Sequence, residues 1–198
     1  MEFDKKYIGR LLLEKDDFYI ICGYDYLQEK YLIRSLRGKF NSCQAINDNY
    51  KLDEKALDYD SMIKSYEEKI LDLRLIDEIV STRRDELPFD EVDKIFRRIE
   101  GCYTNIKLLK HYIERSAYEK QKELYEKEIK NNSKGLKRAL KRLYSTFNED
   151  EYYTIFEFLE KNEFSILYLK TKAANYTQRK NSLEDDYNKF IKNNGISI

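Results

Sequence analysis

The sequence predicts a mostly α-helical protein, an elongated bundle organised around a long antiparallel, coiled-coil-like helical hairpin. Apolar residues recur three and four positions apart through most of the chain, a spacing that places them on one face of a helix. One proline and six glycines among 198 residues leave few positions that interrupt a helix. Charged residues make up 37% of the chain, which is typical of long helices with solvated outer faces.

Residues 53–130 are predicted to form the hairpin. Each arm carries an apolar stripe, and the second arm is expected to continue to residue 130. Pro88, the only proline, lies between the arms and cannot continue a helix, so the chain must reverse there and the arms pack antiparallel. Asp53 is the expected N-cap of the first arm. The stripe residues are Tyr59, Ile63, Tyr66, Ile70, Leu73 and Val80 on the first arm and Val92, Ile95, Ile99, Cys102, Ile106, Leu109 and Ile113 on the second.

Residues 1–52 form the predicted N-terminal segment. Residues 7–24 contain two short runs rich in β-forming residues, which favour a small β-hairpin, with a helix as the alternative. Asp25 and Gln28 have the spacing of a capping box and predict a short helix over 26–37. A loop is expected over 41–51.

Residues 131–198 are predicted to add helices that pack on the hairpin within a single domain. The polar residues 131–133 are expected to interrupt the second arm and to start a short separate helix. Asn148 and Glu151 form a second capping box, which predicts an aromatic helix beyond it. A last helix is expected over 164–193.

Groups that could carry catalysis or bind a metal are sparse in the sequence. His111 is the only histidine, which excludes metal sites that need two of them. There is no glycine-rich phosphate loop, nucleophile elbow or Cys-x-x-Cys pair. We therefore expect no enzymatic activity, no cofactor and no metal site. The three cysteines lie far apart in sequence and are expected to be reduced, buried thiols: Cys22, Cys43 and Cys102.

Basic residues are the first group of candidate binding residues. The net charge is zero, but residues 101–145 hold twelve Lys or Arg against five Glu. One interpretation is a phosphate-contacting, nucleic-acid-binding surface, and the other is the solvated side of amphipathic helices. The candidates are Arg34, Arg37, Lys39, Lys130, Lys134, Lys137, Arg138, Lys141 and Arg142.

Tyrosines are the second group, since the chain has eighteen of them and no tryptophan. Exposed tyrosines are frequent hot spots of protein interfaces, whereas many others lie at the edge of a core with a buried ring and a solvated hydroxyl. The candidates for contact with a partner are Tyr118, Tyr125, Tyr152 and Tyr153.

The predicted function is that of a non-enzymatic interaction protein that binds, and regulates or inhibits, a protein partner. The alternative is nucleic-acid binding through the basic cluster at 130–142. The end of a long hairpin is also a surface that a homo-oligomer would bury. Without a signal sequence or a run of 18 apolar residues, we expect a cytoplasmic protein that makes no membrane contact. The abundance of Tyr, Lys, Asn and Ile is typical of AT-rich genomes, including phages and plasmids of low-GC bacteria.

Overall fold

The computed structural model describes residues 2–15, 17–38, 43–47, 50–88, 90–166 and 169–194. The predicted class is confirmed: the chain is 69% helical and combines a closely packed helical hairpin with a small N-terminal antiparallel sheet. Two compact units are present, Met1–Ile70 with Ala174–Ile198 and Leu71–Ala173, and each is described by itself. The division of the chain into a single domain with three segments stays a prediction.

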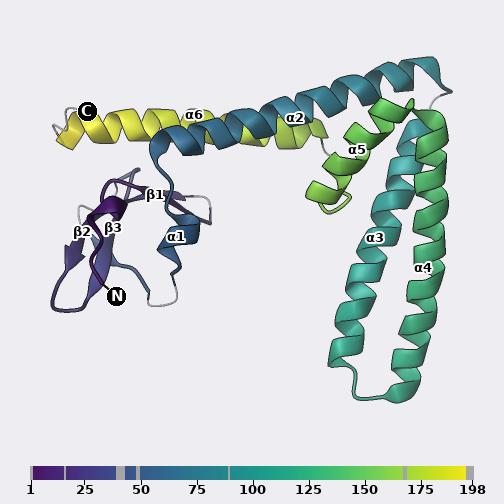
Figure 1. Ribbon diagram of the computed structural model, residues 1–198, viewed down its shortest axis with the longest axis horizontal. Coiled ribbons are helices and arrows are strands. Elements are labelled where there is room, and N and C mark those ends of the chain that lie inside the picture. Colours follow the sequence, from purple (N-terminus) through teal and green to yellow (C-terminus); the bar gives the residue numbers. More distant parts are fainter. Residues whose placement is uncertain are drawn as a thin grey trace. The chain divides into compact units, whose positions relative to one another are not determined.

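The N-terminal unit contains a four-stranded antiparallel sheet with the strand order β1-β2-β3-β4 (Figure 1). The strands are β1 (Leu11–Glu14), β2 (Asp17–Asp25), β3 (Lys30–Ser35) and β4 (Gln44–Ala45). Strands β1 and β2 pair directly, which confirms the hairpin predicted within residues 7–24. The loop predicted over 41–51 contains β4, which pairs with β3 through two residues.

The prediction of a helix over 26–37 is wrong, because this stretch forms a turn and strand β3. The side chain of Asp25 accepts hydrogen bonds from the backbone amides of Leu27 (2.8 Å) and Gln28 (3.2 Å). The interactions expected of a helix cap therefore exist, but they close a tight turn between two strands. Beyond the turn, Tyr31 and Ile33 are both buried at alternate positions, which is the pattern of a strand.

Both faces of the sheet are covered, so its strands contribute to two apolar clusters. One face packs against the N-terminal 3-10 turn η1 (Lys5–Tyr7) and the short helix α1 (Leu52–Lys55). The other packs against the start of α2 (Tyr59–Glu86) and the later part of α6 (Leu169–Asn194). The buried residues are Tyr7, Leu12, Ile21, Tyr31, Ile33, Ile46, Leu52 and Ala56 on the first face, and Leu11, Phe18, Ile20, Leu36, Met62, Tyr66, Leu183 and Phe190 on the second.

Helix α2 begins six residues later than the predicted cap at Asp53. Asp53 lies inside α1, and the residue that caps α2 is Asp58. One carboxylate oxygen of Asp58 accepts from the amide of Ser61 at 2.8 Å, and the other accepts from the Ser61 hydroxyl at 2.7 Å. These bonds hold the pKa of Asp58 below its ordinary value, because they favour the charged carboxylate.

In the unit Leu71–Ala173, the closely packed pair is α3 (Glu91–Arg115) with α4 (Glu119–Thr146), as Figure 1 shows. The predicted assignment of the hairpin to residues 53–130, with its reversal at Pro88, is therefore wrong in position. Helix α2 does end before Pro88, but its last part runs across the N-terminal end of α3 and does not pack along it. The hairpin turn lies instead at 116–118, where the Ser116 hydroxyl accepts from the Tyr118 amide at 3.3 Å.

The predicted interruption at 131–133 is also wrong, because α4 continues through these residues without a break. Asn and Ser lower helix stability by only about 0.5 kcal/mol each. Close packing against α3 opposes that loss: Gly135 is buried, and a methyl group in its place would come within 2.9 Å of the Cys102 sulfur. The side chains of Asn105 and Asn132 join the two helices by a further hydrogen bond (3.3 Å).

Helix α5 (Glu149–Lys161) begins at the predicted capping box, in which Asn148 and Glu151 bond each other's backbone amides. The predicted last helix over 164–193 corresponds to α6, which begins at Leu169. Around the start of the hairpin, each of α2, α3, α4 and α5 contributes buried side chains. They include Ile76, Val80, Ile95, Ile99, Leu143, Ile155 and Leu159.

Candidate functional site

The cations predicted to bind nucleic acid on α4 are all exposed. Lys130, Lys134, Lys137 and Lys141 follow one another at steps of four, three and four residues, which places them in one row along the helix. The row lies opposite the buried Ala139 and Leu143, which face the core. We call these four residues the lysine row.

Acidic residues are missing from this part of the helix. No Asp or Glu occurs between Glu128 and Glu149, a stretch that holds six Lys or Arg. Among the ion pairs of the described residues, Arg142 contacts Glu91, whereas no acid lies within 4.0 Å of the lysine row. Arg138 donates to the carbonyl of Lys134 at 3.3 Å. The lysine row therefore keeps its charge available for a ligand.

Arg34 and Arg37 belong to the other unit, and both are held by neighbouring side chains. Arg37 donates to Asp186 (3.0 Å), to Asp17 (3.3 Å) and to the hydroxyl of Ser182 (2.7 Å). Arg34 lies over the ring of Phe190, at 5.4 Å from its centroid, and donates to Asn194. These two arginines join the sheet to α6. Lys39, the third predicted residue of this group, lies outside the described residues.

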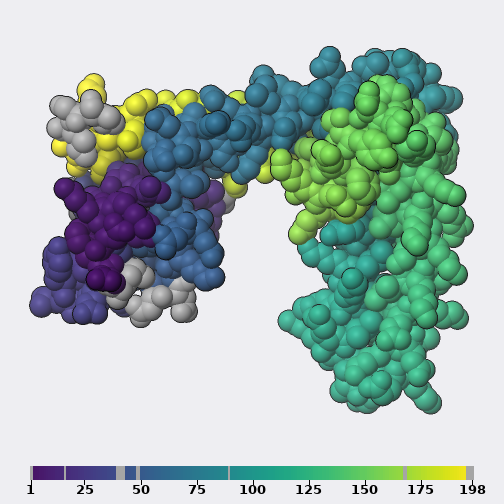
Figure 2. All heavy atoms as spheres, viewed as in Figure 1, coloured from purple at the N-terminus to yellow at the C-terminus, as the bar shows by residue number. Residues whose placement is uncertain are grey.

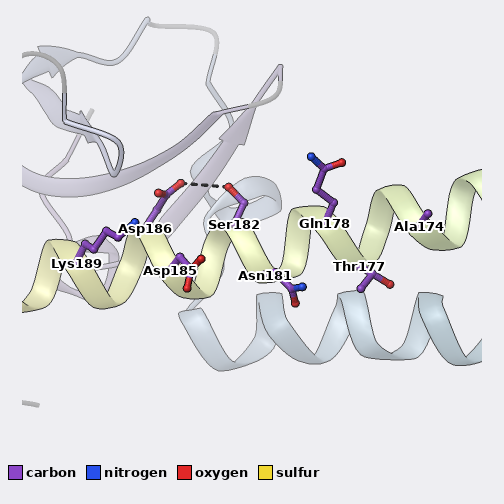
Figure 3. A pocket seen from close by; sticks show the side chains of 8 residues that line it. All are labelled: Ala174, Thr177, Gln178, Asn181, Ser182, Asp185, Asp186 and Lys189. Carbon is purple, nitrogen blue, oxygen red and sulfur yellow. Dashed lines mark hydrogen bonds between the residues drawn. The ribbon is translucent and has the colours of Figure 1, made fainter.

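A hollow of about 600 Å³ lies along α6, and its eight lining residues, labelled in Figure 3, all come from this one helix. A hollow with a single wall is an open surface. Asp186, the acid at one end of it, already accepts from Ser182 at 3.3 Å and from Arg37. The hollow therefore offers no enclosed set of groups that could bind a small substrate.

The α3–α4 hairpin divides into two parts at about residues 107 and 130. In the part near α5, the ring of Phe164 lies 4.7 Å from that of Tyr103, and Lys107 pairs with Glu163 at 2.6 Å. Beyond these contacts, none of residues 108–129 is buried. We call this stretch the distal arm. On the face drawn in Figure 2, α5 covers only the part of the hairpin that lies outside the distal arm.

Large apolar side chains project from the distal arm. Leu108 is 46% exposed, Tyr112 49%, Tyr118 72% and Leu124 62%. Leu108 and Tyr112 are one turn apart on α3, and the Tyr112 ring lies 5.9 Å from that of Tyr125, which follows Leu124 in α4. Leu108, Tyr112 and Tyr125 are thus neighbours, and together with Tyr118 and Leu124 on the same arm they are called the distal apolar patch.

The predicted partner-binding tyrosines occupy two separate places. Tyr118 and Tyr125 are in the distal apolar patch. Tyr152 and Tyr153 are on α5, where Tyr152 is half-buried between Phe156 and Tyr144, at centroid distances of 5.8 and 4.9 Å. Burial raises the pKa of Tyr152, which marks it as a packed ring, while Tyr153 is exposed.

Three residues of the distal apolar patch were missed by sequence reasoning: Leu108, Tyr112 and Leu124. They fall outside the stripe of three-and-four spacings that identifies the side of each helix facing its partner. Their position in the sequence could have identified them, because they are apolar residues that lie next to the stripe and close to a helix end.

Groups suited to catalysis do not converge in the described part of the chain. His111 is exposed, and its nearest aromatic ring is Tyr112 at 6.4 Å. Within the described ranges, no three His, Cys, Asp or Glu side chains gather where they could hold a metal ion. None of the described helices combines the length and the apolar content that a membrane crossing requires.

The expectation of buried thiols is correct for Cys102 and wrong for the other two cysteines. Cys22 and Cys43 are exposed, and their sulfur atoms lie 2.7 Å apart. Twenty residues separate them in sequence, so only the pairing of β2, β3 and β4 brings them together.

A search for similar proteins found no matching family model, no matching curated protein and no matching solved structure. What the protein binds is therefore inferred from its own surfaces.

Proposed function

We propose that this chain is a non-enzymatic interaction protein that binds an amphipathic helix of a protein partner along its distal arm, and thereby regulates or inhibits that partner. The observation that carries the proposal is the distal apolar patch on a two-helix arm without a buried residue. Single exposed apolar residues are ordinary on protein surfaces, but adjacent ones mark contact sites.

A helix is the partner element that best fits this surface. Two helices alone leave the sides of their contact open to water. The apolar residues along this contact are therefore only half-buried: Ile106, Leu109 and Ile113 on α3 and Ile129 on α4. Nearer to α5, other helices complete the packing of the same pair. A third helix laid along the distal arm would bury its apolar residues in the same way.

The charge of the distal arm supports an apolar contact. Residues 108–129 carry five Lys or Arg and five Asp or Glu, so their net charge is zero. A partner attracted mainly by charge would need an excess of one sign at this place. We expect the complex to depend on buried apolar area and to survive at high salt.

The experiment compares the full chain with two substituted forms as bait for proteins from the native host, after nuclease treatment and at high salt. In one form Leu108, Tyr112 and Leu124 are each changed to Ser. In the control form, Leu27→Ser and Tyr26→Ser alter two exposed apolar residues in the turn between β2 and β3. We expect a protein that the full chain and the control form retain and that the distal form loses.

Equal recovery of the same protein by all three forms would reject the distal arm as the binding site. Light scattering of the purified chain distinguishes the other occupant, a second copy of the chain. If the chain forms a dimer that the distal substitutions dissociate, the distal arm binds a second copy of the chain and not a helix of another protein.

A second candidate function, nucleic-acid binding, is favoured by the lysine row. Four lysines on one helix face without an acidic neighbour match the repeated negative charge of a phosphate backbone. Tyr144, half exposed and three residues beyond Lys141, extends the row with an aromatic ring of the kind that stacks on unpaired bases.

The two functions separate by their dependence on salt. If the second holds, Lys134→Glu, Lys137→Glu and Lys141→Glu together abolish binding of a labelled single-stranded oligonucleotide at low salt. The matched control reverses Lys110, Lys120 and Lys127 in the distal arm, with the same change in net charge, and keeps binding. For the unsubstituted chain, the logarithm of the binding constant should fall by about 0.7 per phosphate contact for each tenfold rise in salt concentration. No binding at low salt rejects this candidate.

A further inference from the structure

We propose that Cys22 and Cys43 are a redox modification site, which closes into a reversible disulfide and ties β2 to Cys43, the residue directly before the edge strand β4. Their sulfur atoms are 2.7 Å apart, only about 0.7 Å beyond the length of a disulfide bond. Both side chains are exposed, so an oxidant and a reductant can reach them. This site is independent of the distal arm.

A β-bulge explains how the fold brings Cys22 to this position. The pairing of β2 with β3 shifts between Ile21, opposite Ile33, and Gly23, opposite Leu32. Cys22 is therefore the extra residue of the bulge, and its thiol donates to the carbonyl of Leu32 at 3.4 Å. A bulge changes the direction of a side chain, and here it directs the sulfur over β3.

Cys43 approaches from the other side of β3. It directly precedes β4, whose first residue, Gln44, also pairs with Ile33. The two sulfur atoms thus come from chain segments on either side of one strand, and both lie near residues 32 and 33. A disulfide between them would cross β3 and close a loop of the chain from residue 22 to residue 43.

The oxidant class that we name is a small-molecule disulfide such as oxidised glutathione. The thiolate of Cys43 attacks one glutathione sulfur, which forms a mixed disulfide and releases the other glutathione as a thiolate. Cys22 then loses its proton to solvent and attacks the Cys43 sulfur, which releases the second glutathione thiolate. The protein loses two electrons and two protons, and oxidised glutathione becomes two thiols.

The order of attack follows from the surroundings of Cys22. Although Cys22 is exposed as a residue, neighbouring protein atoms partly shield its sulfur from water. This desolvation, and after it the hydrogen bond with Cys43, raises the pKa of Cys22 to about 12. A thiol reacts as its thiolate, so Cys22 is a poor first nucleophile. It attacks second because its sulfur lies 2.7 Å from the Cys43 sulfur, the atom that the mixed disulfide turns into its target.

The consequence for the fold is control over a weak edge of the sheet. Strand β4 pairs through two exposed residues, Gln44 and Ala45, and the next residue, Ile46, is buried beneath the sheet and donates to the carbonyl of Tyr31 at 2.9 Å. A covalent link at Cys43 would hold this segment in place. Reduction would leave it attached by few hydrogen bonds.

The test incubates the reduced full chain in buffers that span a range of reduced-to-oxidised glutathione ratios, followed by alkylation and peptide mapping. We expect one internal disulfide between Cys22 and Cys43 and a free thiol at Cys102. Cys22→Ser should instead accumulate the mixed disulfide of Cys43 with glutathione. The oxidised chain should melt several degrees above the reduced chain, since closing a loop of this length restricts the unfolded state.

Cys102→Ala is the matched control and should form the same disulfide as the unsubstituted chain. The proposal is overturned if both exposed cysteines become glutathionylated without forming an internal disulfide, or if they pair only between molecules. An internal disulfide that leaves the melting temperature unchanged would overturn its role in holding β4.

Discussion

The two halves of the α3–α4 hairpin use the same pair of helices but differ in packing. Near α5, five residues of α3 are buried, namely Val92, Ile95, Phe96, Ile99 and Cys102, and Gly135, Ala139 and Leu143 face them from α4. In the distal arm, residues 108–129, none is buried. This difference shows that contact between two helices alone leaves the side chains only partly buried. Additional helices bury the first half, and the distal arm has none among the described residues.

The largest difference in the free energy of unfolding is expected between variants of one isoleucine in each half. Ile99→Ala removes a fully buried side chain and should lower the free energy of unfolding by about 2–5 kcal/mol. Ile113→Ala, in the half-exposed distal arm, should cost about 1 kcal/mol or less. Urea denaturation measures both. Equal losses would mean that the distal arm is packed as tightly as the first half.

Helix caps give a smaller difference of the same kind. Asn148→Ala removes the capping box of α5, which closes the packed half, and should cost about 1 kcal/mol. Ser116→Ala removes the hydroxyl that bonds the Tyr118 amide in the distal turn. Its loss should stay below about 0.5 kcal/mol, because the distal arm contributes little to the global stability. A larger effect from Ser116→Ala than from Asn148→Ala would contradict this ranking.

A last contrast, in which one variant should gain stability, concerns two glycines of the packed half. Gly101 has open space around it, so Gly101→Ala should stabilise the chain by about 0.5–1 kcal/mol through helix propensity. Gly135→Ala has the same favourable change in helix propensity. Its new methyl group, however, would lie 2.9 Å from the Cys102 sulfur and 3.2 Å from the Arg98 guanidinium. We expect no net gain, or a loss, at Gly135. Thermal unfolding of both variants tests the contrast, and equal stabilisation would show that the helices are not in close contact there.

The sequence was sufficient for the fold class and insufficient for the hairpin's position. Apolar spacing identified helical segments, but residues 116–118 contain no glycine or proline that would mark a turn. The turn there is closed by short-range hydrogen bonds, among them the bond from the Tyr118 amide to the Ser116 hydroxyl. The polar residues 131–133 looked like a break because propensity is visible in sequence, whereas the approach of Gly135 to Cys102 is not. Tertiary packing decided both positions.

The candidate sites show the same limit. The lysine row could be predicted, because its four lysines lie in a stretch between Glu128 and Glu149 that holds six cations and no acid. Arg37 could not be assigned, since its partner Asp186 is 149 residues away. The pairing of Cys22 with Cys43 depends on a bulge, which leaves no distinctive spacing in the sequence.

The most direct test of the distal arm as an exposed binding surface is amide hydrogen exchange on the free, dilute protein. We predict that amides at 92–102 and 135–146 exchange only through global unfolding, whereas those at 108–129 exchange through local opening, orders of magnitude faster. Uniform protection along both helices at dilute concentration would contradict the account, because it would mean that the distal arm is already packed.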